Sequence, residues 1–137
     1  MKKMILILAF LLLPTNGFAG MEIGPQKLTI PINEVNDGEA HYYSINMDGK
    51  EIRFFVVRSK DGTIRAAFDA CDVCYRSKKG YSQQGDFMVC NNCGMRFHST
   101  RINVVKGGCN PSPLERRTEG DKLVISLDAV RSGAIYF

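Results

Sequence analysis

After residue 20 the chain alternates between short apolar, β-branched runs and polar turn segments. Asp48-Gly49 and Asp61-Gly62 are strong turn signals, and the runs beside them suit antiparallel strands. The run from Ile52 to Arg58 (IRFFVVR) is the most strand-like of all. Residues 21–68 are therefore predicted to form a β-meander that leads to Cys71. Strands are predicted at residues 28–32, 40–47, 52–58, 63–68, 86–90 and 122–127.

The C-terminal segment predicts the only helical structure after residue 20. Asp128 is predicted to cap a short helical turn through Val130, and the apolar tail Ala134 to Phe137 is predicted to pack on the core. Many short strands and little helix indicate a mainly β fold, a small sandwich or barrel with two cysteine loops projecting from one end. Residues 20–137 suit a single domain of modest core, with a helical content below about a third.

The first 19 residues have the pattern of a secretory signal peptide. Lys2 and Lys3 precede an apolar run from Met4 to Leu13, and Gly17-Phe18-Ala19 supplies small residues at a cleavage site after Ala19. The run is too short to span a bilayer comfortably, although an uncleaved anchor remains an alternative. The protein is therefore predicted to be exported to the periplasm or cell envelope.

The charge of the chain is weak once that segment is removed. Residues 1–19 hold two lysines and no acidic residue, so the formal charge falls from +4 to +2. This charge indicates neither a nucleic-acid-binding surface nor a strong patch for anionic lipid. Peripheral association with a membrane stays open.

The chemistry of the chain is concentrated in its five cysteines. Cys71 and Cys74 form one C-x2-C pair, Cys90 and Cys93 form a second, and Cys109 follows in a Gly- and Pro-rich segment. Fifteen residues separate the two pairs, and fifteen more precede Cys109. Two such pairs present four thiolates, which suit a tetrahedral metal ion or an iron–sulfur cluster. The four paired cysteines are the predicted ligands, and Cys109 is a fifth candidate.

Structural disulfides are the competing interpretation, because exported cysteines usually pair. An odd count leaves at least one thiol over, and the spacing of the pairs resembles a zinc ribbon more than scattered disulfides. Three other side chains of the cysteine region are candidate ligands. His98 is the one histidine of the region, and a surface role is favoured for it; Met88 and Met95 are soft donors, and core packing is favoured for them.

Four motifs lie in this part of the chain: AFDACDVCY at 67–75, KGY at 79–81, MVCNNCG at 88–94 and GGCNPSPL at 107–114. Through them the chain resembles the FtrD-like membrane iron–sulfur protein family, strongly over residues 52–114 and more loosely over the last strand. Many members carry this domain after transmembrane helices, so this chain resembles a short exported form. The resemblance implies an iron–sulfur cofactor and a link to iron transport.

A more distant resemblance is to Rieske proteins. The segment from Cys90 to Phe97 resembles their second ligand loop with the histidine replaced by Cys93, and residues 107–114 resemble the loop that covers the cluster. Cys71 and Cys74 would form the first loop, although Rieske proteins have one residue between their ligands there. Two thiolates in place of the two imidazoles give an all-cysteine set, which implies a [2Fe–2S] centre at roughly −400 mV, the ferredoxin range.

Two main functions follow from the sequence. The first is an exported iron–sulfur protein that transfers single electrons to or from iron-transport or membrane redox components. The second is a module that binds zinc or copper for structure or delivery, without redox chemistry. A thiol–disulfide protein is a third and weaker reading, since the thioredoxin-like context is missing. No nucleophile–base pair stands out in the sequence, so a non-enzymatic electron carrier or metal-binding protein is favoured. An enzymatic role stays open.

Overall fold

The computed structural model describes residues 20–137. The proposed signal peptide, residues 1–19, lies outside the described residues. The fold is mainly β, with 41% strand and 16% helix, as the sequence predicts. The strands are β1 (Glu22–Ile23), β2 (Lys27–Pro31), β3 (His41–Met47), β4 (Lys50–Arg58), β5 (Ile64–Phe68), β6 (Tyr81–Gln84), β7 (Phe87–Cys90), β8 (Arg96–His98), β9 (Arg117–Glu119) and β10 (Lys122–Ser126). The helices are α1 (Ile32–Val35) and α2 (Leu127–Ser132), with 3-10 turns η1 (Tyr75–Ser77), η2 (Ser99–Arg101) and η3 (Ala134–Tyr136).

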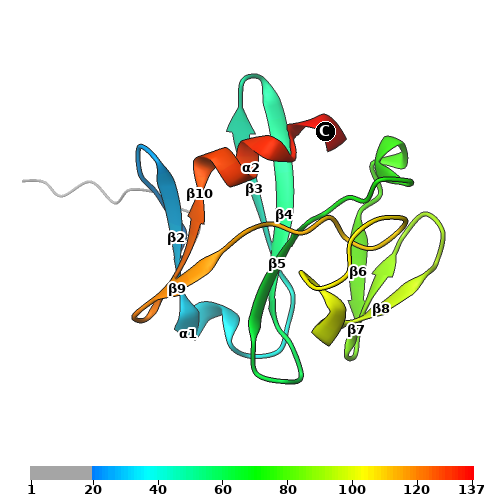
Figure 1. Cartoon of the computed structure of the whole chain (residues 1–137), viewed down its shortest axis with the longest axis horizontal. Coiled ribbons are helices and arrows are strands. Elements are labelled where there is room, and N and C mark those ends of the chain that lie inside the picture. Colours follow the sequence, from blue (N-terminus) through cyan, green and yellow to red (C-terminus); the bar gives the residue numbers. More distant parts are fainter. Residues whose placement is uncertain (1–19) are drawn as a thin grey trace, which may run out of the picture.

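The strands form three small antiparallel sheets, which Figure 1 shows side by side. Sheet A has the order β1-β2-β10-β9, sheet B the order β3-β4-β5, and sheet C the order β6-β7-β8. Sheet B lies between the other two. Residues 20–137 form no closed barrel, so the predicted choice between sandwich and barrel is settled against the barrel.

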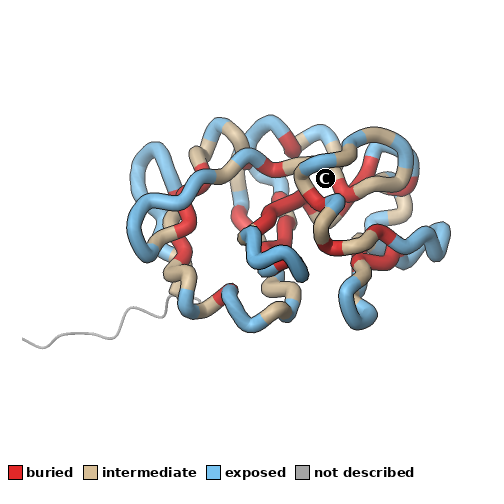
Figure 2. Tube along the Cα trace, turned by 60° about the horizontal axis from the view of Figure 1, so that its bottom comes forward, coloured by how far each residue is buried: buried red, intermediate tan, exposed pale blue. Residues whose placement is uncertain are grey.

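The middle strand β4 explains the unbroken apolar run in the sequence. Successive side chains of a strand point to opposite faces of its sheet. Ile52 and Phe54 lie in the core between sheets A and B, whereas Phe55 and Val57 lie in a second core against sheet C. All four side chains are at most 1% exposed. Sheet B is thus buried on both faces, as the red segments in the middle of Figure 2 indicate.

The two cores are named here by their composition. The strand core contains Leu28, Ile30, Val35, Ile45, Ile52, Phe54, Val56, Ala66, Phe68, Leu114, Leu123, Ile125 and Val130. The cysteine core contains Phe55, Val57, Ala67, Cys71, Cys74, Tyr81, Met88, Cys90, Phe97 and Ile102. The cysteine core is therefore the part of the molecule that positions the candidate site.

The predicted hairpin turn at Asp48-Gly49 is confirmed. Both residues have left-handed backbone angles, with φ of 51° and 79°, and Met47 pairs with Lys50 across the turn. Two left-handed central residues match the right-handed twist of the flanking strands. The tight turn sets the register of β3 on β4.

The C-terminal helix begins differently from the prediction. Ser126, not Asp128, is its N-cap, and the Ser126 Oγ accepts a hydrogen bond from the Ala129 N–H at 3.0 Å. Asp128 lies inside the first turn, where it pairs with Arg131. A serine directly before the helix can accept from the free N–H groups of the first turn, and this placement decides the start. The tail packs on the strand core through Ala134, Tyr136 and Phe137, as predicted.

Residues 32–35 also depart from the predicted pattern, because β2 ends at Pro31 and α1 follows at once. Within residues 20–137, no helix has both the length and the apolar composition needed to cross a bilayer.

Candidate metal centre

The first ligand loop follows β5 and places Cys71 and Cys74 in one tight turn. The Tyr75 N–H donates to the Cys71 carbonyl at 3.2 Å, and the Cys74 N–H donates to the Cys71 Sγ at 3.1 Å. The two cysteines are 1% and 8% exposed. A backbone N–H aimed at a sulfur stabilises the thiolate form, which is the form that binds metals.

The second ligand loop joins β7 to β8. Cys90 is the last residue of β7 and is 2% exposed, whereas Cys93 is exposed. The Gly94 N–H donates to the Cys90 carbonyl at 2.8 Å, and the Cys90 N–H donates to the Met95 carbonyl at 2.9 Å. Gly94 has a φ of 77°, a conformation that favours glycine and lets the turn close.

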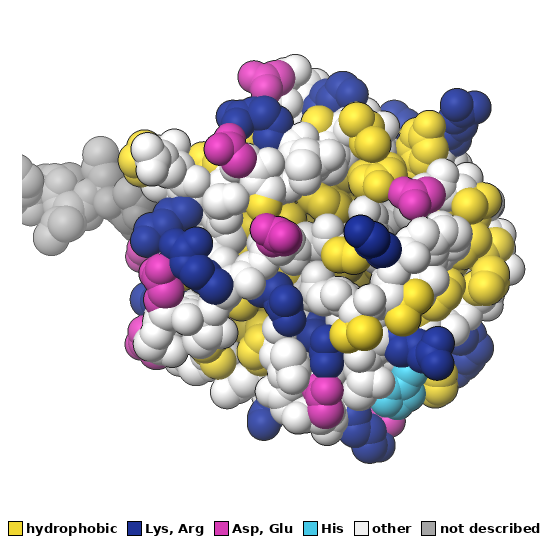
Figure 3. Space-filling model, in the orientation of Figure 1, with side chains coloured by type: hydrophobic (Ala, Val, Ile, Leu, Met, Phe, Trp, Pro, Cys, Tyr) yellow, Lys and Arg dark blue, Asp and Glu magenta, His cyan; other side chains and the backbone are white. Residues whose placement is uncertain are grey.

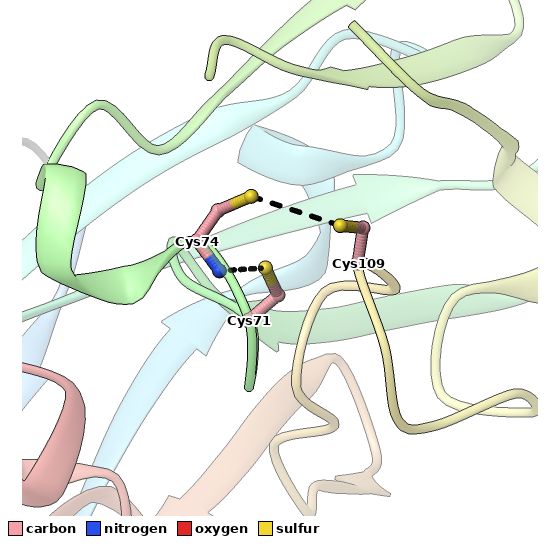
Figure 4. A group of neighbouring side chains, drawn as sticks. All are labelled: Cys71, Cys74 and Cys109. Atoms are coloured by element: carbon pink, nitrogen blue, oxygen red, sulfur yellow. Dashed lines mark hydrogen bonds between the residues drawn. The ribbon is translucent and has the colours of Figure 1, made fainter. Parts of the chain in front are cut away.

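The third segment, the covering loop at residues 104–110, brings Cys109 to the first pair. The Asn110 N–H donates to the Gly107 carbonyl at 3.2 Å, and the Tyr81 hydroxyl donates to the Cys109 carbonyl at 2.5 Å. The Sγ atoms of Cys74 and Cys109 lie 3.7 Å apart, facing one another as Figure 4 shows. This distance is far longer than a disulfide bond.

The three loops gather all five cysteines into two overlapping groups of sulfurs. One group is Cys71, Cys74 and Cys109, and the other is Cys74, Cys90 and Cys93. Within each group the sulfurs lie within 4.8 Å of one another. Cys74 belongs to both groups. All five cysteines are free thiols, so the disulfide interpretation finds no support in residues 20–137.

The buried sulfurs lie against apolar side chains of the cysteine core. Phe97 and Met88 pack in this core, and Val89 is 9% exposed beside Met88. Phe68 belongs to the strand core, because its side chain lies on the opposite face of β5 from Ala67. The buried sulfurs are therefore covered by sheet C and one face of sheet B.

His98, the histidine candidate, lies in neither sulfur group. The ring of His98 packs edge-on against Phe87, and its Nδ1 lies 2.9 Å from the Thr100 Oγ1. Met95 is 54% exposed, and Met88 is core packing, as favoured from the sequence. Cysteine sulfur is thus the donor type that the described residues bring together.

The electrostatics separate two of the three sulfurs of the first group, those of Cys71 and Cys109. Burial acts to raise the pKa of the Cys71 thiol, but the hydrogen bond from the Cys74 N–H, together with the nearby Tyr81 hydroxyl, outweighs it, and the net pKa is lowered. The pKa of the Cys109 thiol is raised, by burial first and then by the neighbouring sulfurs of Cys93 and Cys74. In the metal-free protein Cys71 is therefore the easier thiol of these two to deprotonate.

Tyr81 and Asp69 are parts of the site that the sequence did not single out. The Asp69 Oδ1 accepts from the Tyr81 N–H at 2.7 Å, and Arg53 Nε lies 3.8 Å from the other carboxylate oxygen. Burial raises the pKa of Asp69 to about 6, against these two favourable contacts. Asp69 lies two residues before Cys71, and this position is the one sign in the sequence of its role at the site. Its contacts with Tyr81 and Arg53 depend on how the strands pack, which the spacing of the cysteines does not reveal.

Arg53 and Asp69 also line a small cavity next to the sulfurs. Its volume is about 10 Å³, room for one water molecule, and Cys71, Cys74 and Cys90 line the same space. Arg53 Nε is buried and has no hydrogen-bond partner among residues 20–137. The wall of the site that Arg53 and Asp69 form is therefore polar and charged.

Comparison with protein families gives this arrangement a context. A family model described as "Membrane iron-sulfur containing protein FtrD-like" matches residues 35–137, well over half of the chain. The chain belongs to the FtrD-like family. The FtrD-like match reaches beyond the motif region, since it includes β3, β4 and the C-terminal helix as well as the three cysteine loops. A search of curated proteins returned no match.

The family description implies an iron–sulfur cofactor, and the residues present fit one. Iron–sulfur clusters are held by cysteine thiolates that accept backbone hydrogen bonds. The three FtrD-like loops supply five cysteine sulfurs. One of them, the Cys71 Sγ, accepts a backbone hydrogen bond from the Cys74 N–H. Neither sulfur group contains an imidazole, whereas a Rieske site has two. The distant resemblance to Rieske proteins therefore stays a prediction.

Proposed function

We propose that this FtrD-like protein is an exported iron–sulfur protein that carries single electrons in a cell-envelope system for iron uptake. The observation that carries the proposal is the convergence of five free cysteine sulfurs from three separate loops. The family description supports iron–sulfur chemistry and a membrane setting. The pattern of residues 1–19 supports export, with cleavage after Ala19.

The proposed ligands are Cys71, Cys74, Cys90 and Cys93. Each pair shares one tight turn, whereas a lone cysteine requires its whole loop to be held in place. Cys109 is proposed as a fifth sulfur that hydrogen-bonds to the centre or replaces a ligand. Its proximity to Cys74, at 3.7 Å between sulfurs, supports this role.

A bound cluster would supply a one-electron couple in this site. An all-thiolate [2Fe–2S] centre is expected at roughly −400 mV, because four thiolates put more negative charge on the irons than two imidazoles and two thiolates do. The chain itself excludes water with Phe97 and Met88, and it donates a backbone N–H to the Cys71 sulfur. A hydrogen bond to a ligand sulfur stabilises the more negative, reduced form of a cluster. Removing the hydrogen bond from the Cys74 N–H would therefore lower the reduction potential further.

Cys93 gives the proposed centre a route to the outside. It is the exposed member of the five cysteines, whereas Cys71, Cys74 and Cys90 are buried. An electron carrier needs one edge of its cofactor close to the surface where the partner docks. Cys93 provides that edge, and iron-transport or membrane redox components are the proposed partners.

A zinc or copper module is the second candidate function. Each sulfur group holds three thiols within 4.8 Å, a set that a single Zn²⁺ or Cu⁺ ion can also bind. In this reading the metal stabilises the loops or is handed on, and no electron moves. The covering loop would then supply Cys109 as the third or fourth donor.

The experiment that separates the two functions begins with anaerobic purification of residues 20–137. Visible absorption, metal analysis and electron paramagnetic resonance of the reduced sample are then measured. Iron, acid-labile sulfide, colour and a reduced-state signal support the iron–sulfur carrier, whereas a colourless protein with stoichiometric zinc or copper supports the module. A protein without metal in either case contradicts both proposals.

Single Cys→Ser variants test the ligand set. We expect loss of the centre in the Cys71, Cys74, Cys90 and Cys93 variants and retention in Cys109→Ser. Ser112→Ala is a matched control, because Ser112 lies in the same Gly- and Pro-rich segment without a sulfur. Loss in Cys109→Ser with retention in any paired variant would show that the assignment is wrong.

A further inference from the structure

The surface around the candidate centre differs in charge from the rest of the molecule. Residues 71–110 carry six Lys and Arg against two Asp, a formal charge of +4. The other residues of 20–137 carry ten Lys and Arg against twelve Asp and Glu, a formal charge of −2. The net charge of +2 on residues 20–137 is therefore the sum of two parts of opposite sign.

The loop face is the surface formed by residues 72–80, 91–95 and 104–109. These three segments adjoin, because the Asn91 amide donates to the Lys79 carbonyl at 2.9 Å and the Cys74 and Cys109 sulfurs lie 3.7 Å apart. All charged side chains on the loop face are exposed, and they are four cations and one carboxylate: Arg76, Lys78, Lys79, Lys106 and Asp72.

The charges of the loop face are available to a partner. Lys78, Lys79 and Lys106 form no salt bridge with any carboxylate of residues 20–137. The one acidic group, Asp72, accepts a hydrogen bond from the Tyr136 hydroxyl at 2.7 Å. The cations therefore dominate the field above this face.

The loop face also exposes large apolar side chains. Val73, Met95 and Val104 are 64%, 54% and 67% exposed, one from each of the three segments. Figure 3 shows hydrophobic side chains, with Lys and Arg among them, toward the right, over the end that carries sheet C. Exposed apolar groups with a charged rim are the pattern of a protein-binding surface.

We propose that the loop face is the docking surface for an acidic redox protein, with Cys93 near its centre. This inference rests on the proposed electron transfer, because an exposed ligand edge has a use only if a partner approaches it. An anionic membrane would also attract cations and apolar groups. A membrane on this face would cover the one exposed cysteine with lipid, which neither donates nor accepts an electron, so a protein partner is favoured.

The first test reverses charge on the loop face of the holoprotein. The variant Lys78→Glu/Lys79→Glu is compared with Lys27→Glu/Lys122→Glu, which makes the same charge change on sheet A. The probes are an acidic flavodoxin and a basic cytochrome c, and the readout is the second-order rate constant for oxidation of the reduced holoprotein at low and high salt. We expect the loop-face variant to react about tenfold more slowly with flavodoxin at low salt and faster with cytochrome c.

The controls separate steering by the loop face from the effect of total charge. The sheet A variant is expected to change either rate by less than about twofold, and salt is expected to erase the loop-face effect. Equal changes in the two variants, or wild-type protein that prefers cytochrome c at equal driving force, overturn the proposal. Competition by anionic vesicles that removes the flavodoxin dependence also overturns it, in favour of a membrane.

The second test measures binding alone and distinguishes failure of docking from failure of function. Anisotropy of labelled flavodoxin is measured with Met95→Ser, and with Ile23→Ser as control, since Ile23 is 57% exposed on sheet A. Weaker binding in Met95→Ser alone supports the docking surface. If flavodoxin binds the loop face but no electron moves, the proposed one-electron function is wrong and the docking surface stands. Electron transfer that no loop-face variant alters sinks the docking surface and leaves the function intact.

Discussion

The two cores of this protein are built from different chemical material. Every buried residue of the strand core has a hydrocarbon side chain, whereas the cysteine core contains three buried thiols and the hydroxyl of Tyr81. Burial of apolar surface holds the first core without help. Buried thiols and short strands give the second core less of this stabilisation, so its order is expected to depend on a bound metal.

In sheet B a single strand, β4, contributes side chains to both cores. Phe54 and Phe55 are chain neighbours, yet they lie on opposite faces and in different cores. The geometry of the cysteine loops is therefore fixed from behind by a sheet whose other face is anchored in hydrocarbon.

Metal removal has the largest expected effect. Binding free energies of structural cysteine sites are of order 10 kcal/mol, and this energy becomes folding energy where the site is not preformed. We expect chelation under reducing conditions to raise amide hydrogen exchange across residues 71–111 while β2, β4 and β10 stay protected. Exchange measured by mass spectrometry decides this. A uniform rise over both cores would contradict the division.

Truncating the two phenylalanines of β4 compares the cores directly. Phe54→Ala is expected to lower the free energy of unfolding by about 3–5 kcal/mol, with or without metal. Phe55→Ala is expected to weaken metal retention as well, because Phe55 packs against Tyr81 with ring centroids 6.2 Å apart. Denaturant unfolding and competition with a chelator measure the two effects, and identical metal affinities in both variants would refute the split.

Asn103 connects the two regions with one side chain. Its Oδ1 accepts from the Ala66 N–H at 2.7 Å, and its Nδ2 donates to the Leu114 carbonyl at 3.1 Å. Asn103→Ala is expected to cost about 2–4 kcal/mol, from partners left unsatisfied and from a φ of 67°. Asn103→Gly removes the strain and should recover about 1 kcal/mol. Equal stability of the two variants, by denaturant unfolding, would argue against strain.

Tyr81→Phe tests the electrostatics of the cysteine core. The Tyr81 hydroxyl helps to lower the pKa of Cys71, so its loss should raise that pKa and shift the pH midpoint of metal uptake upward. Titration of Co²⁺ uptake by its absorption measures the shift. Tyr42→Phe is the control, because the Tyr42 hydroxyl donates to the Tyr81 carbonyl at 3.0 Å and touches no cysteine. A common midpoint for all three proteins would show that the Tyr81 hydroxyl does not act on the site.

The smallest expected effect lies on the hairpin between β4 and β5. Hydrogen bonds from Ser59 and the Thr63 N–H, and the Arg65 guanidinium, lower the pKa of Asp61. A lowered folded-state pKa stabilises the fold above the unfolded value near 3.9, and this stabilisation is lost as the pH falls. Asp61→Asn should therefore be less stable than wild type at pH 7 and approach it in acid. A difference that grows toward low pH would reverse the sign.

Much of the strand architecture could be predicted from the sequence. The runs that became β2, β3, β4, β5, β7 and β10 are apolar and β-branched, and Asp-Gly pairs marked the turns. The short strands β1, β6, β8 and β9 were not predicted, because polar residues such as those of Ser82 to Gln84 have little pattern of their own. Their pairing comes from tertiary contacts, which override weak propensity.

The site was predicted in part. C-x2-C spacing placed each pair in a turn, since that depends only on local chain geometry. The approach of Cys109 to Cys74 and the hydrogen bond from Tyr81 depend on how the chain after the covering loop runs along β5, and no spacing rule encodes this. Arg65 illustrates the same limit: it is buried and donates to the Ile102 carbonyl at 2.9 Å, although its sequence neighbours give no sign of it.

The pairing of β2 with β10 has a consequence for when the protein can fold. Leu28 lies opposite Ile125, so the segment that carries every cysteine is a closed loop between two strands from opposite ends of residues 20–137. Closing so long a loop is slow, and it cannot occur before the last strand has been made. The strand core therefore completes itself last, after the whole chain is available, and a chain that stops short of Lys122 leaves β2 without its main partner. Any metal delivered earlier would meet cysteine loops on a sheet B whose other face is not yet covered by sheet A.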